Sequence, residues 1–240
     1  MAGHILKNYR LIDLTHKIDS SIPHWDRGCA FKLLQAQDYL DCQGLVKFRA
    51  QDFHLRAGLG THLDAPAHCI PGGRDIASLN LEDLIAPCYV INVTHKIQNP
   101  DYFISLADIK EFETKYNPNF KNSLLIAYTG WSQYWYQIDK YRNEDEKGNM
   151  HFPGFAVESI RYLLAKGIKG IAIDTLSPDG SHEDFPVHQL MLENGKYIIE
   201  NVINVELLPE VGALIITLPL NIVNATESPV RMIALIDNSL

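Results

Sequence analysis

An apolar strand, a helix and a second apolar strand follow one another in the middle of the chain, and this succession constrains the possible folds most. Residues 124–128 (LLIAY) form a short apolar run that is typical of a buried strand. Residues 156–165 (AVESIRYLLA) repeat their apolar positions at helical spacing, and Gly167 follows as a C-cap. Residues 168–174 (IKGIAID) are apolar again up to Asp174. The chain is therefore predicted to mix α and β elements.

Strands outnumber helices in the rest of the sequence. One further helix is predicted over Ser105–Tyr116, because Ser105 and Asp108 have the spacing of a capping box and Pro118 ends the segment. The remaining apolar segments, each predicted to be a strand, are Tyr9–Leu14, Val46–Leu55, Cys88–Val93, Val211–Leu218 and Arg231–Ile236. No linker and no internal repeat divides the chain, so we predict a single domain over residues 1–240, of mixed and strand-rich α/β class.

Composition and charge exclude several classes of protein. Among 240 residues, 21 Lys and Arg stand against 29 Asp and Glu, a net charge of −8, so the chain lacks the basic surface that binds nucleic acid. No apolar run approaches the ~20 residues that span a bilayer, and the N-terminal segment lacks the apolar core of a signal peptide. The 4 cysteines (Cys29, Cys42, Cys69 and Cys88) form no CxxC pair, which favours reduced thiols. We expect a cytoplasmic protein that binds neither nucleic acid nor membrane.

Segment 58–73 (GLGTHLDAPAHCIPGG) holds the most informative group of side chains. If its first part is extended, His62 and Asp64 point to the same side, and an imidazole beside a carboxylate suits Zn²⁺ or Mn²⁺. Pro66 ends such a strand, which puts His68 on the loop beyond it, where a histidine can act as general acid or base. The alternative is that one histidine is a solvated turn residue and the other a hydrogen-bonded core residue.

A second pair of possible ligands lies in the other half of the chain. His188 precedes an apolar stretch, and Glu200 follows that stretch after Tyr, Ile and Ile. A glutamate in such surroundings must be hydrogen-bonded, ion-paired or metal-bound if it is buried. A glutamate of an edge strand, exposed to water, is the alternative, and spacing alone does not decide between the two.

Segment 58–73 resembles the HxGTHxDxPxH signature of the metal-dependent cyclase superfamily, which includes bacterial kynurenine formamidase and isatin hydrolase. Other segments resemble those of the family, in family order, over about residues 10–236. They are Ile12-Asp13-Leu14-Thr15-His16, Ile22-Pro23-His24-Trp25, Thr129-Gly130-Trp131, His151-Phe152-Pro153-Gly154, Asp174-Thr175, Phe185-Pro186-Val187-His188, Glu200-Asn201 and Pro219-Leu220. The chain is therefore similar to this superfamily along nearly its whole length.

The resemblance implies a swivelling β/β/α fold, a homodimer or larger homo-oligomer, and metal-dependent hydrolysis of a carbon–nitrogen amide bond in a small-molecule substrate. Carried over by position, His62 and Asp64 match metal ligands, with Asp64 bridging where two metals are bound. His188 and Glu200 match the ligands of the second metal, and His68 matches the general acid and base. The implied cofactor is a divalent metal, Zn²⁺ or Mn²⁺, with one or two ions per chain.

Three positions depart from the family pattern. The signature begins with a histidine, normally a ligand of the first metal, where this chain has Gly58. Tyr128 stands in place of the usual arginine before Thr-Gly-Trp. Residues 224–229 resemble the family's GTGSP stretch near the site, with Glu227 in an unusual place. Because Gly58 supplies no donor side chain, the first metal site keeps only two of its three ligands.

Three arrangements of the site follow from this loss. One metal could bind among His62, Asp64, His188 and Glu200, which would leave room for water. His54 could instead reach in from the same strand, although a reach of about 13 Å at ~3.3 Å per residue disfavours this. The site could also be metal-free, in a protein that binds a small molecule without hydrolysing it. Retention of the other ligands favours the enzyme.

We therefore predict a metal-dependent hydrolase of an arylamide, similar to kynurenine formamidase, in which His68 takes a proton from water and returns it to the leaving nitrogen. Hydrolysis or closure of a cyclic amide or lactone, and a metal-free binding homologue, are the alternatives. An aryl substrate needs flat apolar surface, so the predicted substrate wall is drawn from Trp25, Phe31, Trp131 and Tyr134.

Overall fold

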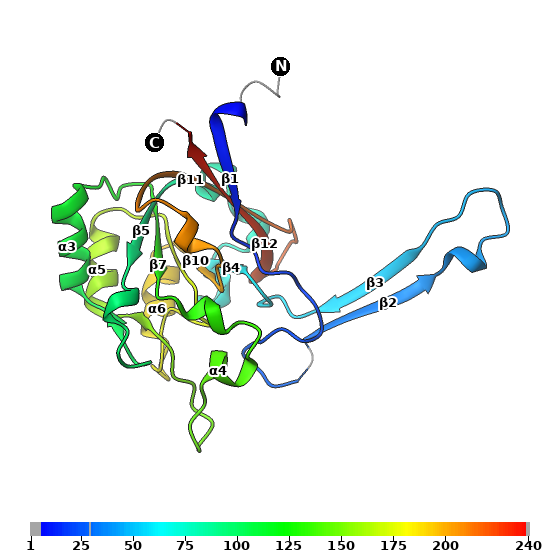
Figure 1. Cartoon of the computed structure of the whole chain (residues 1–240), viewed down its shortest axis with the longest axis horizontal. Helices are drawn as coiled ribbons and strands as arrows, with labels where there is room; N and C mark the ends of the chain where they lie inside the picture. Colours follow the sequence, from blue (N-terminus) through cyan, green and yellow to red (C-terminus); the bar gives the residue numbers. More distant parts are fainter. Residues whose placement is uncertain (1–5, 29, 239–240) are drawn as a thin grey trace.

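The computed structural model describes residues 6–28 and 30–238, and an eight-stranded sheet forms the centre of this part (Figure 1). β12 pairs with β4 as well as with β1 and β11, so the sheet closes on itself. In spatial order its strands are β1 (Tyr9–Asp13), β12 (Glu227–Asp237), β11 (Val211–Pro219), β5 (Ile85–Asn92), β7 (Leu124–Tyr128), β9 (Gly170–Ile173), β10 (Tyr197–Glu200) and β4 (His62–Asp64). Two smaller sheets join β2 (Phe31–Gln37) to β3 (Ala50–Leu55) and β6 (Phe103–Ile104) to β8 (Gly154–Phe155).

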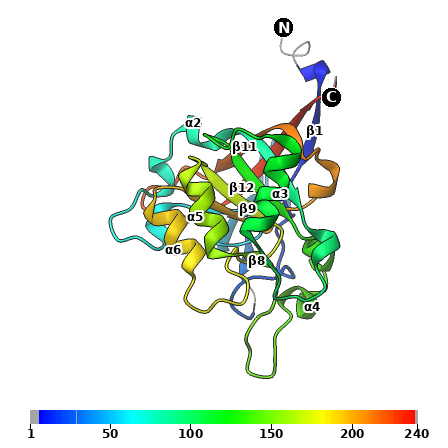
Figure 2. The ribbon, with the colours of Figure 1, turned by 90° about the vertical axis from the view of Figure 1, so that its left-hand side faces the viewer.

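Three helices cover one face of this sheet (Figure 2). They are α3 (Leu106–Tyr116), α5 (Val157–Ala165) and α6 (Pro186–Glu193); the shorter α2 (Leu81–Leu84) and α4 (Ile138–Arg142) lie elsewhere. Strands β5, β7, β9 and β10 run parallel, and parallel neighbours need a crossover between them. In chain order α3, α5 and α6 supply these three crossovers.

Strand β7 shows how the sheet divides the core in two. Leu124 and Ile126 pack inside the closed sheet, whereas Leu125 and Ala127 pack against the helices. Successive side chains of a strand point to opposite faces, so a strand buried on both faces reads as one continuous apolar run. This explains why LLIAY carries so clear a strand signal.

The structure confirms the mixed, strand-rich α/β class and both predicted helices. Ser105 caps α3, and its hydroxyl and the carboxylate of Asp108 form the predicted capping box. Gly167 follows α5 with a φ of +81°, a conformation that glycine adopts without strain. The assignment of residues 1–240 to one domain stays a prediction. Strand β2 and helix α6 were not predicted from the sequence.

The hairpin β2–β3 projects from the body of the molecule (Figure 1). The strand predicted over Val46–Leu55 begins only at Ala50, because residues 42–49 lead into it from the far end of the hairpin. His54 lies opposite Lys32 and is exposed. The backbone therefore carries this alternative ligand onto the projecting arm rather than into the interior.

Three of the four cysteines lie among the described residues. Cys42 and Cys88 are buried, Cys69 is partly buried, and all three are free thiols. Cys29 lies outside the described residues, as do residues 1–5 of the N-terminal segment that was predicted not to be a signal peptide. Within residues 6–28 and 30–238, none of the helices has the length and apolar character needed to cross a bilayer.

His16 is a buried histidine whose ring makes no hydrogen bond within the described part of the chain. Its ring stacks on Trp135 with centroids 3.7 Å apart, and its backbone N–H donates to Thr61 Oγ1 at 3.0 Å. Burial lowers the pKa of His16 to about 3, because the charged ring would lose its hydration and gain no partner. The folded protein therefore holds this side chain neutral.

We predict that His16 weakens the fold in acid. Between pH 6.5 and about 3 the unfolded chain binds a proton that the folded chain excludes, so the free energy of unfolding falls as the pH decreases through that window. At pH 5 this one group costs about 2 kcal/mol relative to neutral pH. The test is urea unfolding near pH 7.5 and near pH 5 with a chelator present. The free energy of unfolding of wild type should fall between the two pH values, and that of His16→Phe should fall by about 2 kcal/mol less. The exposed-site control His54→Phe should behave as wild type. An equal loss in all three proteins would contradict the assignment.

Candidate metal centre

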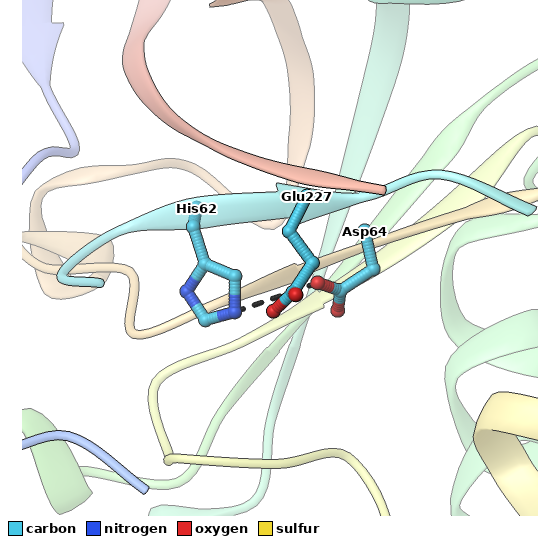
Figure 3. A group of neighbouring side chains, drawn as sticks. All are labelled: His62, Asp64 and Glu227. Carbon is cyan, nitrogen blue, oxygen red and sulfur yellow. Dashed lines mark ion pairs between the residues drawn. The ribbon is translucent and has the colours of Figure 1, made fainter. Parts of the chain in front are cut away.

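The short strand β4 carries the first two candidate ligands. His62 and Asp64 lie two residues apart and share one face, whereas Leu63 points the other way into the core. Backbone pairing places Glu200 of β10 opposite His62, and Glu227 of β12 opposite Asp64. Directly opposed residues of antiparallel strands share a face, so the pairing gathers these four side chains. Figure 3 shows His62, Asp64 and Glu227 pointing toward one another from β4 and β12.

The remaining predicted ligand, His188, comes from the first turn of α6. Pro186 begins the helix, and the buried carboxylate of Asp179 accepts hydrogen bonds from the backbone N–H groups of Val187 at 2.6 Å and His188 at 3.1 Å. The same carboxylate accepts a hydrogen bond from Nδ1 of His188 at 2.6 Å. Asp179 therefore fixes both the start of the helix and the orientation of the imidazole, which leaves Nε2 for the site.

The structure brings the four predicted ligands to one place. Nε2 of His62 lies 3.5 Å from Asp64 Oδ1 and 3.3 Å from Glu200 Oε2. Nε2 of His188 lies 3.6 Å from Asp64 Oδ2 and 3.3 Å from Glu200 Oε1. All four side chains are buried. The alternative of a solvated edge-strand glutamate is excluded, because β10 lies between β9 and β4.

Hydrogen bonds behind the site orient the second histidine as well. Nδ1 of His62 is 2.9 Å from the carbonyl oxygen of Gly60 and donates to it. The side-chain amide of Asn201 donates to the same carbonyl at 3.0 Å. A neutral imidazole with its proton on Nδ1 has its lone pair on Nε2. Both histidines therefore present Nε2 to the carboxylates.

The surroundings of Asp64 indicate whether a cation fits among these four side chains. Both of its carboxylate oxygens are buried, and neither accepts a hydrogen bond from the described residues. A buried carboxylate without such bonds is costly unless a cation compensates it. Asp64, His188 and Glu200 each offer a donor atom, and these atoms lie within 4.8 Å of one another. Imidazole and carboxylate donors are those that Zn²⁺ and Mn²⁺ accept, so the residues fit a divalent cation.

The buried carboxylates shift the pKa values of the site. Burial by itself lowers the pKa of His62, but the charge of Asp64 and the contact with Glu200 outweigh burial and raise it to about 10. Burial of His188 is outweighed in the same way by Asp179, Asp64 and Glu200, which raise its pKa well above the ordinary value. The pKa of Glu200 is lowered, although burial opposes this, because both histidines face it. The cluster therefore attracts positive charge.

His68 stands beside this cluster, at the end of the 3₁₀ turn Pro66–His68. Its Nδ1 lies 3.3 Å from Glu227 Oε2, and this hydrogen bond raises the pKa of His68. The centroids of the His68 and His188 rings are 5.8 Å apart, and the His68 side chain is 32% exposed. It therefore faces the candidate ligands on one side and solvent on the other, a position that suits a proton-transfer group.

Glu227 is a site residue that the sequence did not identify as a ligand. Its carboxylate, with donor atoms of His62 and Asp64, forms a second group whose atoms lie within 4.8 Å of one another. The only signal in the sequence was the unexpected glutamate in segment 224–229. That signal has no chemical meaning until the pairing of β12 with β4 is known.

A cavity of about 530 Å³ opens over the cluster, large enough for a small aromatic molecule. The rings of Trp25 and Phe185 line it and meet edge to face with centroids 5.5 Å apart. The candidate site residues His62, Asp64, His68, His188, Glu200 and Glu227 also line it. The predicted wall residue Trp25 therefore reaches the cavity.

The other aromatic residues proposed for the substrate wall lie elsewhere. Trp131 and Tyr134 line a separate cavity of about 470 Å³. Nε1 of Trp131 donates to the carbonyl of Tyr141 at 2.9 Å, which holds the indole within a core cluster. Phe31 begins β2 and packs against that cluster. None of the three is among the described residues that line the cavity over the ligands.

Comparison with known proteins gives consistent matches. Residues 12–191 match the family described as "Putative cyclase". An isatin hydrolase of Roseibium aggregatum is 32% identical over an alignment of 188 positions that covers 74% of this chain and 71% of that protein. A kynurenine formamidase of Polaromonas naphthalenivorans is 29% identical over 175 residues, or 72% of this chain and 69% of that protein.

Solved structures of similar fold include isatin hydrolases. An isatin hydrolase bound to the product analogue thioisatinate superposes with a TM-score of 0.89 at 25% identity, covering 99% of this chain and 97% of that one. Isatin hydrolase A from Ralstonia solanacearum gives 0.88 at 26% identity, covering 98% and 95%. The family match and the 32% identity along most of both chains together show that this protein belongs to the cyclase family.

Proposed function

We propose that this chain is a metal-dependent hydrolase that cleaves a carbon–nitrogen bond of an aromatic amide. The observation that carries the proposal is the buried cluster of His62, Asp64, His188 and Glu200 beneath a cavity, with His68 beside it. Membership in the cyclase family supports it, as does similarity to an isatin hydrolase and to kynurenine formamidases.

The four buried side chains would hold one or two divalent cations. When bound, Zn²⁺ or Mn²⁺ supplies Lewis acidity toward the amide carbonyl and toward water. The protein's own part is to keep the donor atoms in place. The Gly60 carbonyl and Asp179 fix the two imidazole rings from behind, and neighbouring strands fix Asp64 and Glu200.

His68 is the proposed proton-transfer group. Its Nδ1 is engaged by Glu227, so Nε2 is free to accept a proton from water as the water oxygen adds to the amide carbon. The same atom returns that proton to the nitrogen as the carbon–nitrogen bond breaks. One water is consumed, and a carboxylic acid and an amine are released.

The walls of the cavity favour an aryl substrate. Trp25 and Phe185 offer flat apolar surface close to the ligands. An arylamine leaves more readily than an alkylamine, which suits a site whose candidate proton donor is one half-exposed histidine. A linear arylamide, as in kynurenine formamidases, is the first substrate class to test.

A cyclic amide such as isatin is the second candidate. It is favoured by the similarity to isatin hydrolases, which holds over 99% of this chain in the superposition with the thioisatinate complex. Ring opening needs the same attack on the carbonyl and the same return of a proton to nitrogen. Assays of an aryl formamide and of isatin side by side would separate the two substrates.

We predict that Glu200→Gln weakens cation binding by at least ~10-fold, because an amide keeps the size of the carboxylate but removes its charge. Elemental analysis and calorimetric titration with Mn²⁺ and Zn²⁺ measure the effect. Glu206→Gln, an exposed carboxylate outside the cluster, is the matched control and should bind as wild type. A wild-type protein that takes up neither metal would overturn the proposed function.

We predict that His68→Ala lowers kcat at least ~10²-fold while the bound cation is kept, because only the proton-transfer step is removed. His54→Ala, which removes an exposed histidine of the hairpin, should leave the rate unchanged. Hydrolysis of an aryl formamide followed by absorbance, with metal content measured on the same samples, provides both readouts. An unchanged rate in His68→Ala would remove His68 from the mechanism.

A further inference from the structure

We propose that Glu227 is the third ligand of a second cation site, which it forms with His62 and Asp64, and that it occupies the space left open by Gly58. The inference rests on the proposed function, since it concerns the same metal centre. It assigns a role to a glutamate that comes from a strand far along the chain from segment 58–73.

The position of Glu227 follows from backbone pairing. β12 pairs antiparallel with β4 at Glu227 opposite Asp64 and Pro229 opposite His62. The carboxylate therefore lies on the ligand-bearing face of β4, and Figure 3 shows it between His62 and Asp64. Donor atoms of these three residues lie within 4.8 Å of one another, a spacing that small adjustments close around a cation bound at ~2.0–2.2 Å.

Gly58 provides the second observation. A Cβ atom added at Gly58 would overlap Oε1 of Glu227 and would lie 3.4 Å from Nε2 of His62. The backbone of Gly58 is not among the positive-φ glycines, so its conformation does not require glycine. The requirement is one of space. A side chain at position 58 would displace the carboxylate of Glu227 from its present place, and both positions lie beside the same imidazole nitrogen.

Asp64 provides the third observation, because its two unpartnered oxygens face different histidines. Oδ1 lies 3.5 Å from Nε2 of His62, and Oδ2 lies 3.6 Å from Nε2 of His188. Glu200 is divided in the same way, with Oε2 toward His62 and Oε1 toward His188. Such a division is what two neighbouring cations require. One cation belongs with His188, and the other with His62 and Glu227.

Glu227 also contacts His68, and the experiment must separate that contact from ligation. Its Oε2 lies 3.3 Å from Nδ1 of His68, while Oε1 faces position 58. A glutamine at position 227 keeps an acceptor for His68 but loses the charge that a cation needs. Glu227→Gln therefore tests ligation with the positioning contact preserved.

The test counts cations per chain in protein stripped with chelator and reloaded with Mn²⁺, by elemental analysis and calorimetric titration. Wild type should hold two, and Glu227→Ala and Glu227→Gln should each hold one. The spectrum of bound Mn²⁺ in electron paramagnetic resonance should change from a coupled pair to an isolated ion. Asp26→Ala, which removes another carboxylate at the cavity wall, should keep two.

A reciprocal exchange tests the spatial argument. Glu227→Gly alone should hold one cation, because it removes the third donor. Gly58→His combined with Glu227→Gly should recover two cations, because a Cβ atom at position 58 would lie 3.4 Å from His62 Nε2, and an imidazole attached there can reach the same ion. Circular dichroism of each variant checks that the fold is kept.

The outcomes separate this inference from the proposed function. Equal cation counts in wild type, Glu227→Ala and Glu227→Gln would overturn the inference, whether the count is one or two. If Glu200→Gln still loses its cation in that case, the proposed function is kept and only the role of Glu227 is rejected. No uptake by wild type would overturn both.

Discussion

Negative charge buried where three strands meet is the constraint on which the rest of this structure depends. Asp64 is 1% exposed, and its oxygens accept no hydrogen bond within residues 6–28 and 30–238. Glu200 is buried beside it, and burial of two carboxylates without compensation would cost several kcal/mol. The compensation available is the pair of imidazoles, whose pKa values rise accordingly. A divalent cation can replace those protons.

The closed sheet makes this arrangement possible. β4 has only three residues, yet it pairs on one side with β10 and on the other with β12. Each pairing brings a glutamate opposite a residue of the His62–Asp64 pair. A slip of one residue in either pairing would turn the ligands to the opposite face, so the core packing of Leu63 also protects the site.

Local patterns predicted those parts of the molecule whose geometry is local. The capping box at Ser105 and the buried run of β7 depend on neighbouring residues alone. The candidate ligands could also be named from the sequence, since histidines and carboxylates stand out in apolar segments and match a family signature. The start of α6 could not be predicted in this way, because Phe185 adopts a φ of +48° and Asp179 caps the helix from eight residues before Val187. β2 has no alternating pattern, since most of its side chains are exposed.

Residues whose role depends on distant pairing could not be found in the same way. Glu227 gains its place from the register of β12 against β4, which no nearby residue specifies. Trp131 was an equally reasonable wall residue until a hydrogen bond to the Tyr141 carbonyl placed it in a core cluster. An aromatic side chain has no sequence mark that distinguishes a packed interior from the wall of a cavity.

The pairing of β12 with β4 also has a consequence during biosynthesis. His62 and Asp64 leave the ribosome long before Glu227, and β4 gains its second neighbour only after β12 has been made. Contacts so distant in sequence require a long loop to close, which costs chain entropy. Glu227 therefore joins the other candidate ligands only after β12 has paired with β4. A cation that binds only the fully paired arrangement would stabilise it relative to incompletely paired chains.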